Sequence, residues 1–137
     1  KKVRQFIVTS SSRKQVDLLI SHLFIDLNPF EFIISSDDVN LHKPHPSPYL
    51  KAIEQSSLKV SEALVFEDSI PGIKAALAAN LPTIYVPSNI PTVIDKKINL
   101  DFIVNTLGDE ENMSKVIKGP KLENKFVDYN YLQKLLI

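Results

Sequence analysis

The stretch LVFEDSIPGIKAALAANLPTIYV, from Leu64 to Val86, decides the fold of this chain. Residues 63–66 form a wholly apolar run, which is typical of a strand that a parallel sheet buries on both faces. Pro71 suits the first turn of an alanine-rich helix, and Asn80 is suited to end that helix. A second β-like run covers residues 82–87. This order of strand, helix and strand predicts parallel strands joined by a crossover helix.

The rest of the chain continues the alternation of strand-like and helix-like runs. Further strands are expected over residues 5–10, 30–35 and 101–104, and helices over residues 13–27 and 48–56. The first helix has an apolar face that is expected to point inward, formed by Val16, Leu19, Ile20, Leu23 and Leu27. Residues 108–125 are polar and are expected to be irregular, and residues 126–137 predict a short strand and a terminal helix. We therefore predict an α/β fold with a Rossmann-like three-layer α/β/α core, whose mainly parallel sheet is incomplete at its N-terminal side.

Composition is that of a single globular domain. The 137 residues are enough for one core, and lysine plus arginine balance aspartate plus glutamate at 16 each. Zero net charge argues against broad binding of nucleic acid, which needs a basic face. The sequence has no cysteine, no signal peptide and no apolar run of the ~18 residues that a membrane helix needs. We expect a cytoplasmic protein that binds neither nucleic acid nor membrane.

Polar side chains gather where the predicted strands end. Thr9 and Ser10 end the first strand, and Lys43 lies in the loop after the second. Glu67 and Asp68 follow the apolar third strand. The carboxyl ends of parallel strands share one edge of a sheet, so one small ligand can reach all of these groups. Hydroxyl and N–H groups hold phosphoryl oxygens, an ammonium neutralises their charge, and carboxylates bind a hard cation, so the set predicts a site for a small phosphorylated substrate with Mg²⁺.

Each of these residues also has a simpler interpretation. The hydroxyls of residues 9–12 can cap the helix that begins near residue 13. Lys43 can be an ordinary solvated loop lysine, and Glu67 with Asp68 can form a helix cap. The combination favours a phosphate site, because every group stands at or beyond a strand end.

Three segments resemble the haloacid dehalogenase-like hydrolase superfamily, most closely its β-phosphoglucomutase-like branch of phosphatases and phosphomutases. The segments are IVTSSSR, KPHPSPYLKAIE and the stretch quoted first, and they match the second, third and fourth motifs of that superfamily. The resemblance covers roughly residues 4–104. It implies Mg²⁺-dependent phosphoryl transfer through an aspartyl-phosphate, with a sugar phosphate or a similar small metabolite as the substrate.

The resemblance also implies a role for each residue of the set. Thr9 takes the position of the hydroxyl that holds a phosphoryl oxygen, and Ser10 beside it donates a backbone N–H. Lys43 takes the position of the lysine that bridges the phosphate and the nucleophile. Glu67 and Asp68 take the acidic positions that bind Mg²⁺, directly or through water. Thr9 and Lys43 are therefore the expected catalytic residues of this chain.

One part of the superfamily's pattern does not occur in this sequence. The first motif, Asp-x-Asp followed by Gly-Thr, supplies the nucleophile and the general acid/base, and the chain contains no Asp-x-Asp. The helical cap that selects the substrate normally lies between that motif and the strand over residues 5–10. The chain begins at Lys1, and its only methionine is Met113. We expect a C-terminal core fragment, one domain over residues 1–137 without the cap, that is inactive alone and has a gap in its sheet.

Two other functions stay open on the sequence. A catalytically silent relative would bind a phosphorylated ligand without converting it. A receiver-like signalling domain also combines strand-end acids, a hydroxyl and a lysine on a parallel sheet, but there the acids come first and the lysine last. A first motif in the sequence upstream of residue 1 would favour the enzyme.

Overall fold

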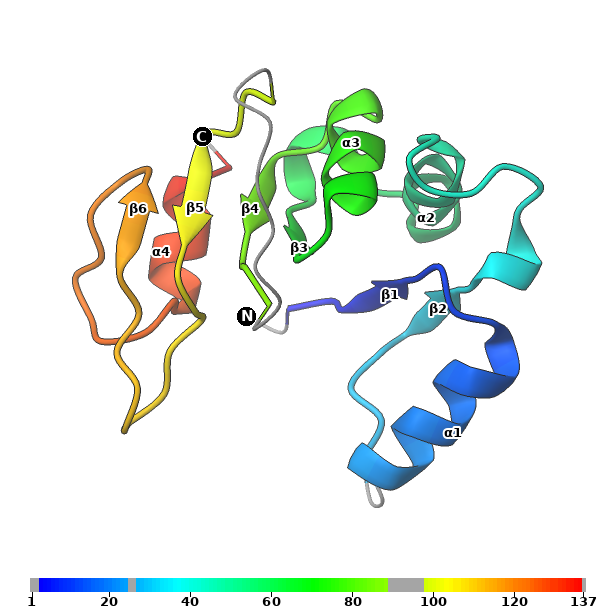
Figure 1. Ribbon diagram of the computed structural model, residues 1–137, viewed down its shortest axis with the longest axis horizontal. Coiled ribbons are helices and arrows are strands. Elements are labelled where there is room, and N and C mark those ends of the chain that lie inside the picture. Colours follow the sequence, from blue (N-terminus) through cyan, green and yellow to red (C-terminus); the bar gives the residue numbers. More distant parts are fainter. Residues whose placement is uncertain (1–2, 25–26, 89–97, 137) are drawn as a thin grey trace.

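The computed structural model describes residues 3–24, 27–88 and 98–136, and strands alternate with helices as far as residue 85 (Figure 1). The strands are β1 (Phe6–Val8), β2 (Phe32–Ile34), β3 (Val65–Glu67), β4 (Thr83–Tyr85), β5 (Phe102–Val104) and β6 (Val116–Lys118). The helices are α1 (Arg13–Leu23), α2 (Ser47–Ser56), α3 (Ile70–Ala78) and α4 (Tyr129–Lys134), with 3-10 turns η1 (Ser36–Asp38) and η2 (Val60–Glu62). No helix in these ranges has the length and apolar character needed to cross a membrane.

The strands form two separate sheets within the described residues. β1 pairs with β2 in parallel, and the other sheet has the order β3-β4-β5-β6, in which only β5 and β6 are antiparallel. Figure 1 shows the β1–β2 pair and α1 on one side of the molecule and the larger sheet on the other. α2 contacts β1, β2 and α3, and so it joins the two parts. The prediction of an α/β fold with mainly parallel strands is confirmed, and the expected gap lies between β1 and β3, which do not pair.

Helices cover both faces of the larger sheet. Successive residues of a strand point to opposite faces, and Ile84 and Tyr85 of β4 illustrate this alternation. Ile84 packs with Tyr131 and with other apolar residues of the C-terminal segment that contains α4. Tyr85 packs with Ile73 of α3 and with Leu100. The sheet is therefore the middle of three layers, with α3 packed on one face of β4 and α4 packed on the other.

The ends of α3 follow from local sequence signals. The hydroxyl of Ser69, the N-cap residue, accepts a hydrogen bond from the backbone N–H of Gly72 at 3.2 Å. Pro71 lies in the first turn, where its missing N–H costs nothing. Asn80 follows the C-cap residue Ala79 with a φ of 58°, in the left-handed region that commonly ends a helix. The crossover between β3 and β4 is thus defined by residues that act locally.

The predicted inward face of the first helix is wrong for most of its residues. Leu19, Leu23 and Leu27 are 58%, 64% and 74% exposed, and Val16 is the buried residue of α1. The helix ends at Leu23 rather than at Leu27, because Phe24 has left the helical region with φ −128° and ψ 63°. The apolar periodicity defines one face of the helix, but it does not show whether another segment packs on that face. No other part of the described chain covers the apolar face of α1.

The C-terminal third departs from its prediction in two places. Residues 108–125, expected to be irregular, contain β6, which pairs with β5 through Val104 and Val116. The strand expected near residue 126 does not form, and the chain goes directly into α4 after Asp128. The carboxylate of Asp128 accepts a hydrogen bond from the N–H of Tyr131 at 2.8 Å and caps this helix. A three-residue strand is too short to produce a clear alternation in the sequence.

Candidate active site

The five residues predicted from the sequence meet at one polar pocket of about 470 Å³. The pocket lies at the ends of β1 and β3 and in the loops that follow them. It is lined by Thr9, Ser10, Lys43, Glu67 and Asp68, together with Val8, Ser11, Gln15, Phe66 and Ser69. The structure therefore brings together side chains that are up to 59 positions apart in the sequence, since Thr9 and Asp68 border the same space.

The hydroxyl of Thr9 keeps a proton that it can donate to a ligand. Its Oγ1 accepts a hydrogen bond from the N–H of Ser11 at 3.1 Å, which leaves the hydroxyl hydrogen uncommitted by that contact. Ser10 beside it is exposed. The N-cap residue of α1 is Ser12, one of the four residues that the sequence allowed for this role. Its backbone N–H donates to Gln15 Oε1 at 3.0 Å. Thr9 and Ser10 are therefore not needed to cap α1.

The side chain of Lys43 is buried in the site, so the interpretation as a solvated loop lysine is wrong. Its side chain is 8% exposed, and its ammonium forms an ion pair with Glu67. The same Nζ donates to the backbone oxygen of Val8 at 2.9 Å and to the hydroxyl of Tyr49 at 3.2 Å. All three ammonium protons therefore have acceptors inside the protein, because Lys carries three donors and no acceptor.

Glu67 is held from several directions. Its Oε1 accepts from Lys43 and from the hydroxyl of Tyr49, and its Oε2 accepts from the hydroxyl of Ser69 at 3.1 Å. A Cβ at Gly72 would lie 1.9 Å from Oε2, so α3 approaches the carboxylate as closely as a glycine allows. With both oxygens bonded and the helix against it, Glu67 has one well-defined orientation.

Asp68 has a very different environment from its neighbour. Its side chain is exposed, and it makes no hydrogen bond or ion pair within residues 3–24, 27–88 and 98–136. Lys43 already compensates the buried charge of Glu67, and Asp68 keeps its charge in contact with solvent. The two adjacent acids therefore do not need a metal ion to relieve their mutual repulsion.

Burial governs the acid–base state of the phenol in this cluster. Burial, followed by the nearby charges of Glu67 and Asp68, raises the pKa of Tyr49 far above its ordinary value. The phenol therefore remains protonated throughout the physiological range. It can donate to the Glu67 carboxylate without becoming a second negative charge.

The donor set fits part of a Mg²⁺ site. Mg²⁺ prefers oxygen ligands, and Asp68 offers a free carboxylate at the edge of the pocket. Glu67 Oε2 accepts one hydrogen bond, from Ser69, and so keeps an acceptor site with which it can reach a cation directly or through water. In the part of the chain that the structure describes, no three His, Asp or Glu side chains converge to hold a metal. These two acids thus need further oxygen ligands from backbone, water, substrate or another segment.

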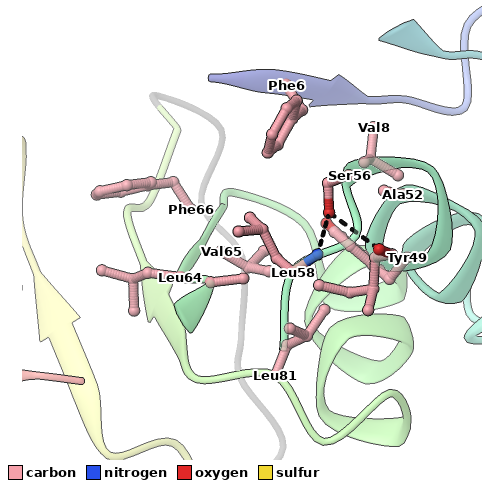
Figure 2. Close-up of a pocket in the computed structure, with 12 residues that line it drawn as sticks. Phe6, Val8, Tyr49, Ala52, Ser56, Leu58, Leu64, Val65, Phe66 and Leu81 are labelled. Carbon is pink, nitrogen blue, oxygen red and sulfur yellow. Dashed lines mark hydrogen bonds between the residues drawn. The ribbon is translucent and has the colours of Figure 1, made fainter. Parts of the chain in front are cut away.

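A second, apolar cavity of about 170 Å³ lies between the two sheets (Figure 2). Phe6 and Val8 of β1 border it on one side, and Val65 with Phe66 of β3 borders it on another. Phe66 is 42% exposed, so the prediction that this strand is buried on both faces is wrong. The reason is that β3 is an edge strand of its sheet: among the described residues, no strand pairs with it on the side of β1.

Two residues of the site were missed by reasoning from the sequence. Tyr49 lies in the helix predicted over residues 48–56, and a buried tyrosine usually has a partner for its hydroxyl, but the sequence did not indicate that partner. Ser69 gave a cap signal as the residue before Ile70 and Pro71 in the first helical turn. Its hydroxyl both accepts from Gly72 and donates to Glu67, so a cap residue also orients an acid of the site.

Comparison with known proteins agrees with these features. The profile of the family described as haloacid dehalogenase-like hydrolase matches residues 1–86. A bifunctional riboflavin kinase/FMN phosphatase from Arabidopsis thaliana is 33% identical over 103 residues, which are 75% of this chain and 27% of that protein. A phosphoglycolate phosphatase from Nitrosococcus oceani is 30% identical over 107 residues, 77% of this chain and 47% of that protein. The chain thus spans less than half the length of these relatives.

Solved structures have the same fold. CbbY from Rhodobacter sphaeroides, in complex with phosphate, is 25% identical with a TM-score of 0.70 over 76% of this chain and 47% of that chain. A structure described as a β-phosphoglucomutase from Thermotoga maritima is also 25% identical, with a TM-score of 0.59 over 70% of this chain and 43% of that chain. Because the family profile covers well over half of its residues, the chain belongs to the haloacid dehalogenase-like hydrolases, in their β-phosphoglucomutase-like branch.

Proposed function

We propose that the full-length protein is a Mg²⁺-dependent phosphatase or phosphomutase that acts on a small phosphorylated metabolite, with a sugar phosphate as the first candidate. The observation that carries the proposal is the polar pocket that Thr9, Ser10, Lys43, Glu67 and Asp68 line together. It combines hydroxyl donors, an ammonium and carboxylates, which are the groups that phosphoryl transfer needs. We keep the cytoplasmic location as part of this proposal.

The chemistry of the relatives supports the class of substrate. The Rhodobacter sphaeroides relative has been crystallised with phosphate, and a mutant of it with xylulose-1,5-bisphosphate. Other relatives are described as an FMN phosphatase and a phosphoglycolate phosphatase. All of these ligands and activities involve a phosphate group on a small molecule, so we propose the same class of substrate here.

In the proposed mechanism, this chain binds and orients the phosphoryl group. The hydroxyl of Thr9 and the backbone N–H of Ser10 donate hydrogen bonds to the non-bridging phosphoryl oxygens. Lys43 places its positive charge beside the same oxygens, whose negative charge it stabilises in the transition state. Asp68, with Glu67 behind it, would hold Mg²⁺. When bound, the ion would neutralise further charge on the phosphoryl group.

We further propose that the nucleophile comes from outside these 137 residues. The carboxylate of an aspartate would attack phosphorus, the bond from phosphorus to the leaving oxygen would break, and water or a sugar hydroxyl would then take the phosphoryl group from the aspartate. The edges of β1 and β3 that no strand of the described residues pairs with, and the apolar cavity between them, support the insertion of a strand that carries this aspartate. Such a strand would deliver its carboxyl end beside Lys43.

The test is a panel of phosphate esters assayed with the full-length protein, in Mg²⁺ and in a chelator. We expect turnover of small phosphate esters that requires Mg²⁺, and no turnover by the 137-residue chain alone. Turnover by that chain, with contaminants excluded, would contradict an external nucleophile. Binding of inorganic phosphate without turnover of any ester by the full-length protein would instead favour the catalytically silent alternative.

A further inference from the structure

Tyr49 connects the core of the protein to the candidate active site. It lies in the first turn of α2, and its side chain is 5% exposed. The ring belongs to the apolar cluster that contains Val65 and Ala75, and it borders the cavity in Figure 2. The hydroxyl at the other end of the ring reaches Lys43 and Glu67. A rigid ring anchored in the core therefore places one polar atom between the two charged groups of the site.

The directions of these hydrogen bonds follow from the groups involved. An ammonium has no lone pair, so Lys43 donates and the Tyr49 hydroxyl accepts, at 3.2 Å. The hydroxyl then has its single proton left for Glu67 Oε1. The phenol thus relays a chain of hydrogen bonds from the cation to the anion. It contacts both partners of the ion pair at the same time.

We propose that Tyr49 is a positioning residue, whose hydroxyl keeps Glu67 in place when the ammonium of Lys43 turns toward a phosphate. This inference rests on the proposed function. All three protons of Lys43 are used inside the protein, so contact with a phosphate requires that one of them be released. After that release Tyr49 still donates to Oε1 of Glu67, and Ser69 still donates to Oε2. The buried carboxylate therefore keeps a partner on each oxygen.

Replacement of the hydroxyl alone separates this role from packing. Tyr49→Phe keeps the ring in the apolar cluster and leaves Glu67 dependent on Lys43 at Oε1. The ammonium is then held back from the phosphate. In the full-length protein with p-nitrophenyl phosphate and saturating Mg²⁺, we expect kcat to fall about tenfold while KM changes by less than about twofold.

A second readout does not depend on activity. A buried ammonium with three acceptors exchanges its protons slowly enough to be followed in nitrogen-edited proton NMR spectra. We expect the Lys43 ammonium signal of the full-length protein to shift in Tyr49→Phe, and to change less on saturation with inorganic phosphate than it does in the wild type. A role limited to packing would leave this signal and its response unchanged.

Tyr131 provides a matched control. It is also a buried tyrosine, 3% exposed, and its hydroxyl has no hydrogen-bond partner in the described part of the chain. Tyr131→Phe removes the same atom from another buried ring, in an apolar cluster outside the polar pocket. We expect it to leave kcat and the Lys43 signal as in the wild type.

The outcomes separate the failure of this inference from the failure of the proposed function. If the wild type turns over no phosphate ester, the proposed function fails, and the NMR comparison still tests the link between Tyr49 and Lys43. A folded Tyr49→Phe with wild-type kcat and an unchanged Lys43 signal would overturn the inference. If Tyr49→Phe does not fold, the test is made on the wild-type protein. A nuclear Overhauser effect between the Tyr49 ring and the Lys43 ammonium supports the contact between these two groups, and its absence overturns the inference.

Discussion

The ammonium of Lys43 and the carboxylate of Glu67 form an ion pair that is almost sealed from solvent, with 8% and 6% of the two side chains exposed. A buried charge that loses its partner is strongly destabilising, because its desolvation is no longer compensated. Lys43 therefore has two roles that a mutation will affect together. It supports the fold through Glu67, and it is the proposed cation for the phosphoryl group.

We predict that Lys43→Met lowers the free energy of unfolding by about 3–5 kcal/mol, because Glu67 stays buried without its cation. Adding Glu67→Gln should restore part of the loss, and urea unfolding of both single variants and the double variant measures the coupling. The pair Lys134 and Glu123 is the control, since its side chains are 42% and 74% exposed. The corresponding coupling there should be below about 1 kcal/mol. Equal coupling at the two sites would contradict the buried pair.

Gly72→Ala is predicted to destabilise the protein by about 1–3 kcal/mol, although alanine is the better helix former. The new Cβ would lie about 2 Å from the carboxylate of Glu67, which cannot move away without losing Lys43, Tyr49 or Ser69. In a Glu67→Ala background the same change should be neutral or stabilise by up to about 1 kcal/mol. Chemical unfolding of the four proteins measures this reversal of sign. A loss of equal size in both backgrounds would assign the glycine to backbone packing alone.

Asp68→Asn is predicted to abolish the stabilisation of the full-length protein by Mg²⁺ while leaving the metal-free protein within about 0.5 kcal/mol of the wild type. A ligand at ~100 times its dissociation constant stabilises the native state by about 2.7 kcal/mol, so the effect is measurable in thermal melts. Glu110→Gln, a change at an exposed acid outside the site, is the control. A mutant that gains as much from Mg²⁺ as the wild type would remove Asp68 from the metal site.

Asp38 is predicted to make stability depend on pH in the acid range. Its carboxylate accepts from the hydroxyl of Ser35 at 2.6 Å, from the N–H of Ser35 at 2.7 Å and from Arg13 Nη2 at 3.0 Å. The hydroxyl of Ser35, first among these groups, lowers the pKa of Asp38. A lowered pKa in the folded state gives stability that is present above the ordinary value near ~4 and is lost as the pH falls through the folded pKa.

Urea unfolding between neutral pH and pH ~3 tests this dependence. Asp38→Asn should show a smaller loss of stability on acidification than the wild type. Asp17→Asn, at an exposed acid of α1, should lose as much stability as the wild type does. If acidification affects Asp38→Asn and the wild type equally, the carboxylate of Asp38 does not contribute to this dependence.

The sequence predicted those parts of the fold that depend on local signals. The crossover from β3 through α3 to β4 was predicted because an apolar run, Pro71 and Asn80 each act within a few residues. The members of the polar pocket were predicted because strand ends in a parallel sheet lie at one edge. Their catalytic roles remain predictions.

Other features depend on contacts between distant segments, and local patterns do not encode them. The pairing of Lys43 with Glu67 joins residues 24 positions apart through a loop and a helix. The partners of the Tyr49 hydroxyl could not be predicted for the same reason. Periodicity indicates that a residue faces inward, but not which atoms its side chain contacts. The exposed leucines of α1 are the converse case: their pattern defines an apolar face, and nothing in the described chain covers it.

The candidate site straddles two sheets that no strand pairing connects in the described residues. Thr9 follows β1 and Glu67 ends β3, while Lys43 bonds to Val8 on one side and to Glu67 on the other. The residues of this site therefore stay together only while the two sheets keep their relative position, which depends on side-chain packing and on the bonds of Lys43. We predict that a partial separation of the two sheets would move the residues of the candidate site apart before any strand or helix unfolds. Activity should therefore disappear at a lower denaturant concentration than the far-ultraviolet circular dichroism signal.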